Sequence, residues 1–98
     1  MQHRLAIDVG SSGVKVYAGG LTDGRLQFEQ IARMDNETGW EDGRHVWDVQ
    51  ALTDRLRDEM AEAVSEYGSV RSIGIDATAL DFGLLADGDL LRNPYFYR

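Results

Sequence analysis

The chain has 98 residues and a mass of 11.0 kDa, enough for one small domain with a core of its own. Its 43% hydrophobic and 28% charged residues argue against a disordered tail, and no apolar run approaches the roughly 20 residues of a membrane helix. A net charge of −7 makes nucleic acid and anionic membranes poor partners, because like charges repel. With no cysteine and no recognisable secretory leader, we expect a cytoplasmic protein without disulfides.

The types of charged residue are unevenly represented. Lys15 is the only lysine, the remaining positive charge is arginine, and Asp outnumbers Glu. An acidic, lysine-poor surface is typical of halophilic proteins, because high salt screens self-repulsion over a few ångströms. A GC-rich genome, which favours Arg, Asp, Gly and Ala codons, explains the same composition, so both explanations stay open.

The first third of the chain predicts a meander of three strands. Alternating or continuous apolar residues mark these strands at 5–8, 14–20 and 26–34. Gly10-Ser11-Ser12-Gly13 predicts a tight turn between the first two, because glycine allows backbone angles that a Cβ forbids. Asp23-Gly24 is a hairpin signature and predicts the second turn.

Residues 35–45 are polar and predict a loop, after which a helix is expected. Asp48 is a suitable N-cap, and Gly68 is placed to end the helix. One apolar stripe runs along it at three- and four-residue spacing, formed by Val49, Leu52, Leu56, Met60, Ala63, Val64 and Tyr67. Trp47, directly before the cap, is predicted to pack into the core.

The last third predicts more strands. Residues 72–77 read as a buried strand, and residues 81–85 and 89–91 as a hairpin around Asp87-Gly88. The predicted order is therefore three strands, a helix, a strand and a hairpin. A helical crossover after a meander predicts an α/β fold, with a mixed sheet and the helix packed on one face.

The first candidate site is the segment from Asp8 to Lys15. The carboxylate of Asp8 ends a buried strand, and the following turn can present backbone N–H groups and two serine hydroxyls to a phosphate. Lys15 can reach the same phosphate as a point charge. The segment is not a Walker A loop, because it leads into a strand. A plain hairpin turn with a surface lysine would have the same pattern.

The second candidate site is Asp76 with Asp81. Asp76 ends another apolar strand. If the first and fourth strands are parallel neighbours, Asp8 and Asp76 lie side by side at the edge where open α/β sheets bind ligands. Two carboxylates there could bind sugar hydroxyls or a hydrated Mg²⁺, or they could only cap turns.

Several short motifs occur in order along the whole chain. They are Asp8-Val9-Gly10-Ser11-Ser12 with Lys15, Arg33-Met34-Asp35-Asn36, Val46-Trp47-Asp48-Val49, Ile73-Gly74-Ile75-Asp76 with Leu80-Asp81-Phe82, and Asn93-Pro94-Tyr95-Phe96-Tyr97-Arg98. Together they resemble the FGGY carbohydrate kinases, in particular their rhamnulokinase-like branch. This resemblance implies part of a ribonuclease-H-like domain, the fold of the sugar kinase and actin superfamily.

The resemblance also implies a chemistry, the transfer of the γ-phosphate of ATP to a sugar hydroxyl with Mg²⁺. Asp8 would lie near the transferred phosphate and hold the metal through a water. The residues implied as γ-phosphate contacts are Gly10, Ser11, Ser12 and Lys15. The residues implied as sugar contacts are Asp76, Thr78, Ala79 and Asp81. Such transfer is mostly positioning and charge neutralisation, which suits this set.

Two of the chain's departures from the family pattern bear on its function. Ala77-Thr78-Ala79 stands where the family has Thr-Trp-Gly, so an aromatic wall of the sugar pocket is missing and rhamnulose itself is in question. Family members have several hundred residues in two domains, with the general base and the adenosine pocket beyond residue 98. We therefore expect residues 1–98 to be the incomplete N-terminal part of the first kinase domain, inactive alone and without a second domain.

Two other functions fit the residues. A non-catalytic α/β module would self-associate or bind a partner through an open sheet edge, and light scattering would detect self-association. A phosphate-binding regulatory domain would bind Mg-ATP through the turn at Gly10–Lys15 alone, which a titration would detect.

Overall fold

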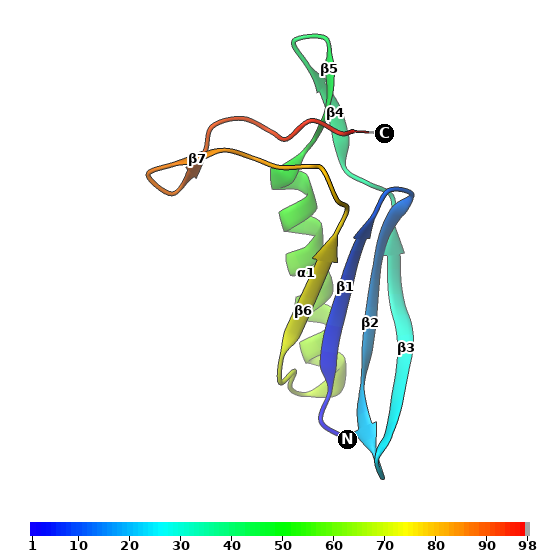
Figure 1. Cartoon of the computed structure of the whole chain (residues 1–98). Helices are drawn as coiled ribbons and strands as arrows, with labels where there is room; N and C mark the ends of the chain where they lie inside the picture. The colour runs from blue at the N-terminus through cyan, green and yellow to red at the C-terminus, as the bar shows by residue number, and fades with distance from the viewer. Residues whose placement is uncertain (98) are drawn as a thin grey trace.

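A four-stranded mixed sheet with one helix on one face forms the body of the molecule, in a computed structural model that describes residues 1–97 (Figure 1). The elements of this body are β1 (Arg4–Gly10), β2 (Gly13–Thr22), β3 (Arg25–Met34), α1 (Val49–Tyr67) and β6 (Ile73–Ala77). The strand order is β3-β2-β1-β6, in which only the pair β1–β6 is parallel. The predicted α/β class, mixed sheet and crossover helix are confirmed.

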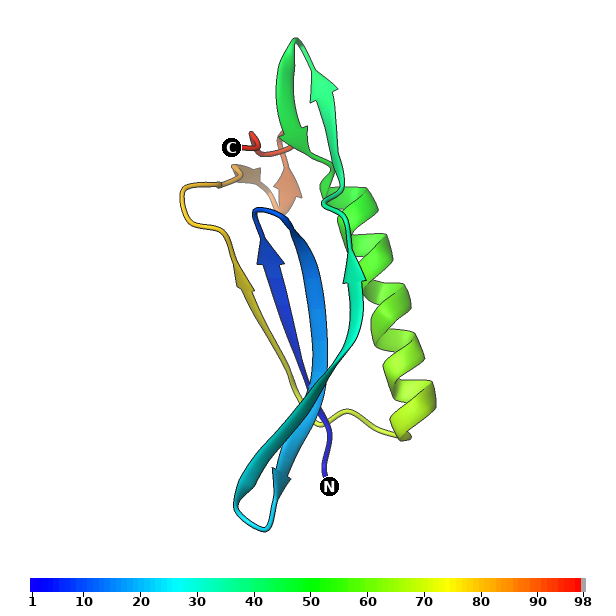
Figure 2. The same ribbon diagram turned by 90° about the vertical axis from the view of Figure 1, so that its right-hand side faces the viewer.

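The core lies between this sheet and α1, which covers one face (Figure 2). Alternation along β1 and β2 places their apolar residues on the helix side, and the cross-strand partners Ile7 and Val16 are 1% and 0% exposed. The predicted stripe supplies the facing layer, with Val49, Leu52, Leu56, Met60, Ala63 and Tyr67 packed in the core clusters. Val64 is the exception, at 46% exposure.

Both ends of α1 have the predicted caps. Asp48 Oδ1 accepts a hydrogen bond from the Ala51 N–H at 3.0 Å, which satisfies one of the free donors of the first turn. Gly68 ends the helix at φ 82°, and its N–H donates to the Val64 carbonyl at 2.9 Å. Trp47 is 5% exposed, so its predicted place in the core is confirmed.

The prediction of a loop at residues 35–45 is wrong. This stretch contains a hairpin of β4 (Thr38–Glu41) and β5 (Arg44–Trp47), which projects beyond the sheet (Figure 1). Asp42 and Gly43, at φ 51° and 74°, form the two-residue turn that such a hairpin needs. Because both strands are short and mostly polar, their alternation is too weak to be recognised, although the Asp-Gly signature is present.

The strand predicted at 72–77 is confirmed as β6, but its predicted burial is wrong. Ile75 points to the same face as its partner Ile7, yet it is 63% exposed. In the part of the chain that the structure describes, β6 is the outermost strand of its sheet, so one side of Ile75 has nothing to pack against.

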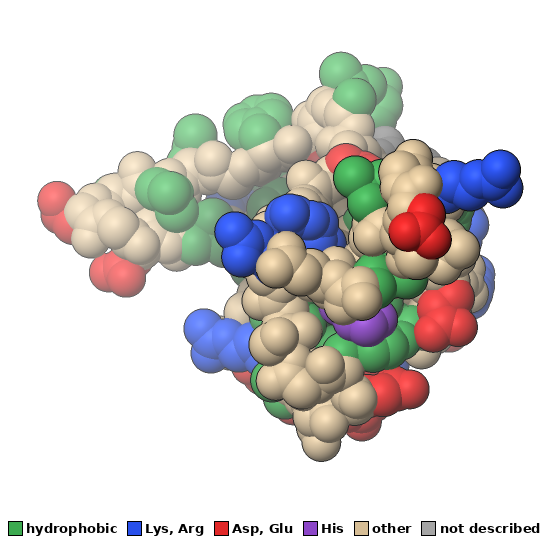
Figure 3. All heavy atoms as spheres, turned by 90° about the horizontal axis from the view of Figure 1, so that it is seen from below, with side chains coloured by type: hydrophobic (Ala, Val, Ile, Leu, Met, Phe, Trp, Pro, Cys, Tyr) green, Lys and Arg blue, Asp and Glu red, His purple; other side chains and the backbone are tan. Residues whose placement is uncertain are grey.

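The predicted C-terminal hairpin is present but shorter than expected. Its strands are β7 (Leu85–Ala86) and β8 (Asp89–Leu90), and they form an arm that extends from the body (Figures 1 and 3). The radius of gyration is 15.4 Å, above the about 13 Å of a compact domain of this length. Within residues 1–97 no helix is long and apolar enough to cross a membrane.

Candidate functional site

Two carboxylates lie side by side at the carboxyl ends of the parallel strands β1 and β6. Asp8 and Asp76 are direct partners in the register of this pair, as the parallel arrangement predicted. Their side chains share a hydrogen bond, and this bond, desolvation and repulsion by Asp8 raise the pKa of Asp76 above its ordinary value. Two neighbouring carboxylates mark a position that a divalent cation could take.

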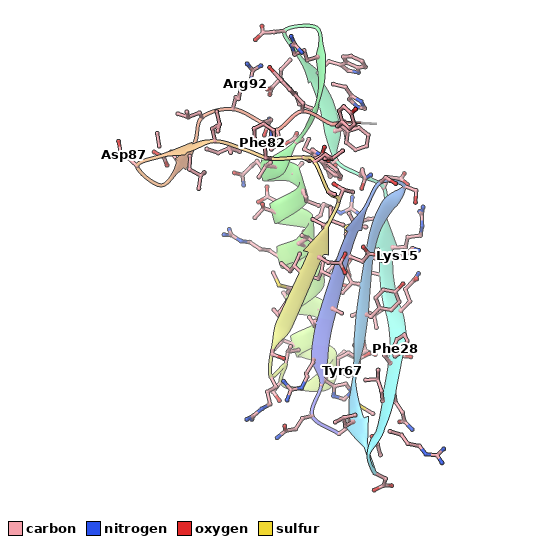
Figure 4. All side chains as sticks on the ribbon, in the orientation of Figure 1. Lys15, Phe28, Tyr67, Phe82, Asp87 and Arg92 are labelled. Atoms are coloured by element: carbon pink, nitrogen blue, oxygen red, sulfur yellow. The ribbon has the colours of Figure 1, made fainter. Side chains whose placement is uncertain are left out.

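Two cations continue this row across the sheet. Lys15 of β2 is the partner of Asp8, and Arg33 of β3 is the partner of Lys15. Cross-strand partners share a face, so all of these side chains lie on the face of the sheet opposite α1, where Figure 4 labels Lys15. The sheet thus presents two carboxylates for a cation next to two cations for an anion.

The turn between β1 and β2 closes this row at one end. Gly10 and Gly13 are partners, so Ser11 and Ser12 alone form the exposed tip. Gly13 has φ 152°, and a Cβ on it would lie 3.1 Å from Arg33 Nη2. A Cβ on Gly10 would lie 3.2 Å from the Gly13 carbonyl and 4.0 Å from Asp8 Oδ1. Both glycines therefore keep the turn tight and leave room beside the Asp8 carboxylate.

The turn is also held from β3 and the residues after it, by contacts that sequence reasoning missed. Asn36 Nδ2 donates to the carbonyls of Gly10 and Ser11, and Arg33 Nη2 donates to that of Ser12. Both residues belong to the motif that carried the family resemblance. No local pattern could have shown the contact, because it joins residues 21 to 26 positions apart.

The segment after β6 is organised around Asp81. Its Oδ2 accepts from Trp47 Nε1 at 2.9 Å and from Thr78 Oγ1 at 2.8 Å, and its Oδ1 accepts from the Tyr97 N–H at 3.3 Å. Leu80 has φ 78°, an unfavourable angle for a residue with a Cβ. Asp81 thus joins the end of β6, the end of β5 and the C-terminal segment, while Ala79 lies exposed between them.

A cavity of about 410 Å³ opens next to this segment. Its walls come from residues 80–84, 92–95 and 97 and are mostly apolar, with Leu80, Phe82, Pro94 and Tyr95 among them. Figure 4 labels Phe82 and Arg92 on the two chain segments that flank it. The sequence-predicted sugar contacts are therefore split: Asp76 lies in the carboxylate pair, and Asp81 lies on the cavity wall.

The carboxylate pair fits a hydrated Mg²⁺ better than a fully protein-bound metal. Among the described residues no group of three or more His, Cys, Asp or Glu could hold a metal ion. Mg²⁺ needs only one or two carboxylates, because it keeps several waters and takes phosphate oxygens as further ligands. Asp8 and Asp76 supply these two, and the donor chemistry fits the ion.

The fold and this site define the class of the chain. It is an α/β segment whose sheet edge combines a glycine turn, a carboxylate pair and a lysine. No family model matches the chain. It is 37% identical over 98 residues to a rhamnulokinase of Bacteroides thetaiotaomicron, 35% over 98 residues to one of Oceanobacillus iheyensis and 33% over 94 residues to one of Bacillus subtilis. These alignments cover 99, 99 and 95% of this chain.

The chain is thus similar over nearly its whole length to rhamnulokinases, and the resemblance to this branch of the FGGY carbohydrate kinases that the motifs carry is confirmed. The chain spans about one fifth of the length of these curated relatives, with 20, 21 and 19% of each covered.

Proposed function

We propose that this chain is the N-terminal part of the first domain of an ATP-dependent carbohydrate kinase, which transfers a γ-phosphate to a sugar hydroxyl. The observation that carries the proposal is the carboxylate pair of Asp8 and Asp76 beside the turn at Gly10–Gly13. Similarity to rhamnulokinases over nearly the whole chain supports it. The cytoplasm is the location that suits this reaction.

The phosphate end of the site would work by positioning and charge. Ser11 and Ser12 would offer N–H and hydroxyl donors to the γ-phosphate, Gly10 would allow it to approach, and Lys15 would neutralise it. Asp8 would hold Mg²⁺ through a bound water. The metal, when bound with ATP, neutralises charge on the phosphates.

The sugar end would lie after β6. Asp76 and Thr78 would offer polar contacts to sugar hydroxyls, and Ala79 would form part of the wall. Asp81 already accepts three hydrogen bonds from the chain, which suits a role in holding the sugar-binding segment in shape as well as in contacting the sugar. The small Ala77-Thr78-Ala79 segment leaves the sugar open to a rhamnulose-like ketose or a related sugar.

The fold supports an incomplete ribonuclease-H-like domain. The sheet order β3-β2-β1-β6 leaves Ile73 and Ile75 exposed, and the molecule is less compact than a finished domain. We expect the 98-residue chain to lack turnover, because nothing in it is identified as a general base for the sugar hydroxyl or as an adenosine pocket.

The test is a coupled ATPase assay of the full-length protein encoded by the gene, with rhamnulose and a panel of related ketoses. We expect sugar-dependent ADP formation that Asp8→Asn reduces and that the 98-residue chain does not show. Absence of turnover with every sugar would overturn the proposal. Turnover by the 98-residue chain above a no-enzyme control would overturn only the expected inactivity.

A second candidate function is favoured by the exposed apolar residues of β6. A non-catalytic module could pair through this edge, because Ile73 and Ile75 are 45% and 63% exposed. Light scattering of the purified chain should then show a dimer or larger species, which Ile75→Lys should disperse. A monomer at high concentration would exclude this candidate.

A further inference from the structure

A single side-chain amide holds two successive carbonyls of the turn between β1 and β2. Asn36 Nδ2 lies 3.1 Å from the Gly10 carbonyl oxygen and 3.0 Å from that of Ser11. Both distances are ordinary for N–H···O hydrogen bonds, and an amide NH₂ has two hydrogens, so Asn36 can donate to both at once. Asn36 lies just after the end of β3, on a different part of the chain.

This contact decides which way the turn presents its donors. The two carbonyls belong to the peptide units that also carry the N–H groups of Ser11 and Ser12. In a trans peptide, the C=O and the following N–H point in opposite directions. Because both carbonyls converge on Asn36, the N–H groups of Ser11 and Ser12 are directed to the other side. Neighbouring N–H groups arranged in this way form a concave site for an anion.

Arg33 acts in the same way on the next peptide unit. Its Nη2 donates to the Ser12 carbonyl at 3.1 Å, and the guanidinium lies so close to Gly13 that a Cβ there would be only 3.1 Å away. Three successive carbonyls of the turn therefore accept from the stretch between Arg33 and Asn36. Their partial negative charge is compensated, so it repels a phosphate on the N–H side of the turn less strongly.

The amide orientation of Asn36 is set by the turn alone. Its Oδ1 is buried and has no hydrogen-bond partner among the described residues. A rotated amide would place this oxygen against two carbonyl oxygens, which repel it. A buried acceptor without a partner lowers stability, so Asn36 supplies two donors to the turn at a cost to the fold.

We propose that Asn36 is a positioning residue for the phosphate-binding turn, and that Arg33 has the same role at the Ser12 carbonyl. Asn36 does not touch the phosphate. It acts through the turn, by directing the Ser11 and Ser12 N–H groups toward the γ-phosphate. This inference rests on the proposed function, because the γ-phosphate that the turn would bind belongs to the ATP of the proposed reaction.

The kinetic test uses the full-length protein and Asn36→Asp, which keeps the side-chain shape but replaces the donor by an oxygen. We expect kcat/KM for ATP to fall roughly 10- to 100-fold, because a displaced turn no longer matches the transferring group. The KM for the sugar should stay nearly unchanged. Asn36→Gln keeps the NH₂ group and should recover part of the loss.

The matched control is Arg55→Met. Arg55 Nη1 bonds Glu37 Oε1 at 3.2 Å, so this variant loosens the residue next to Asn36 without touching the turn. It should leave kcat/KM for ATP unchanged. Wild-type ATP kinetics in Asn36→Asp would overturn the positioning role while the proposed function stands, and so would an equal loss in Arg55→Met.

A second measurement separates the two proposals if no sugar is turned over. Hydrogen exchange of the peptide that contains Ser11 and Ser12, in the full-length protein, reports the turn directly. We expect Mg-ATP to slow this exchange in the wild-type protein and to have no effect in Asn36→Asp. Equal slowing in both proteins, or none in the wild type, would overturn the positioning role.

Discussion

Strands β1 and β6 lie side by side and carry matching patterns, Leu5-Ala6-Ile7-Asp8 in β1 and Ile73-Gly74-Ile75-Asp76 in β6. Each of these patterns ends in a carboxylate, and the cross-strand partners Ile7 and Ile75 both point to the helix side of the sheet. Ile7 is 1% exposed, whereas its partner Ile75 is 63% exposed. The pattern determines that a strand forms and which face each side chain takes, but the place of the strand in the sheet determines how much of that side chain is buried.

The two strands also continue differently. The chain reverses directly after β1, through a two-residue turn whose carbonyls are held by Asn36 and Arg33. After β6 it runs out through a segment that Asp81 ties to Trp47. Side-chain donors therefore hold the turn after β1, whereas a side-chain acceptor, the Asp81 carboxylate, holds the segment after β6.

The largest difference is expected on truncating the paired isoleucines. Ile7→Ala should lower the free energy of unfolding by about 2–5 kcal/mol, because it leaves a cavity in a closed core. Ile75→Ala should cost less than about 1 kcal/mol, since most of that side chain already contacts water. Urea unfolding of both variants measures this, and equal losses would show that β6 is covered in solution.

The next effect concerns Asp81. Asp81→Ala leaves Trp47 Nε1 buried without its acceptor, which should cost about 1–3 kcal/mol. The matched control is Asp89→Ala in the exposed hairpin β7–β8, which should change stability by less than about 0.5 kcal/mol. If the two variants unfold at the same urea concentration, Asp81 does not anchor the segment after β6.

Glycines of the two strand regions should respond in opposite directions. Gly13→Ala should destabilise by about 1 kcal/mol or more, because φ 152° and the nearby Arg33 guanidinium oppose a Cβ. Gly74→Ala in β6 has open space around it and should be neutral or stabilise by up to about 1 kcal/mol. Thermal unfolding of the two variants decides this, and a loss at Gly74 would contradict the open surroundings of β6.

The smallest effect is electrostatic. Because Asp8 raises the folded-state pKa of Asp76, the folded state holds that proton more tightly than the unfolded state. This contribution to stability is complete below the unfolded pKa of Asp76 and is lost as the pH rises through its folded pKa. Asp8→Asn should lower the pKa of Asp76 and so remove this pH-dependent loss of stability. An NMR titration that follows the carboxyl carbon of Asp76 tests this expectation. An unchanged pKa would show that Asp8 does not influence the ionisation of Asp76.

Local signals were sufficient for most elements of the sheet and for the helix. The turn at Gly10–Gly13, the cap at Asp48 and the end at Gly68 follow from residue types whose backbone preferences act within a few positions. The hairpin of β4 and β5 was missed, because four-residue polar strands give little alternation. Its Asp42-Gly43 turn was the one local sign of it.

For the candidate site, sequence alone determined the ingredients. The two strand-ending carboxylates, the glycine turn and Lys15 are all readable from residue order, and the motifs identified the family. The tertiary structure decided which of these residues contact one another. It joined Asn36 to the turn, Asp81 to Trp47 and Asp8 to Asp76, and it left Ile75 exposed. The physical reason is range: backbone preferences act between neighbours, whereas burial and long-range hydrogen bonds depend on which strands lie next to each other.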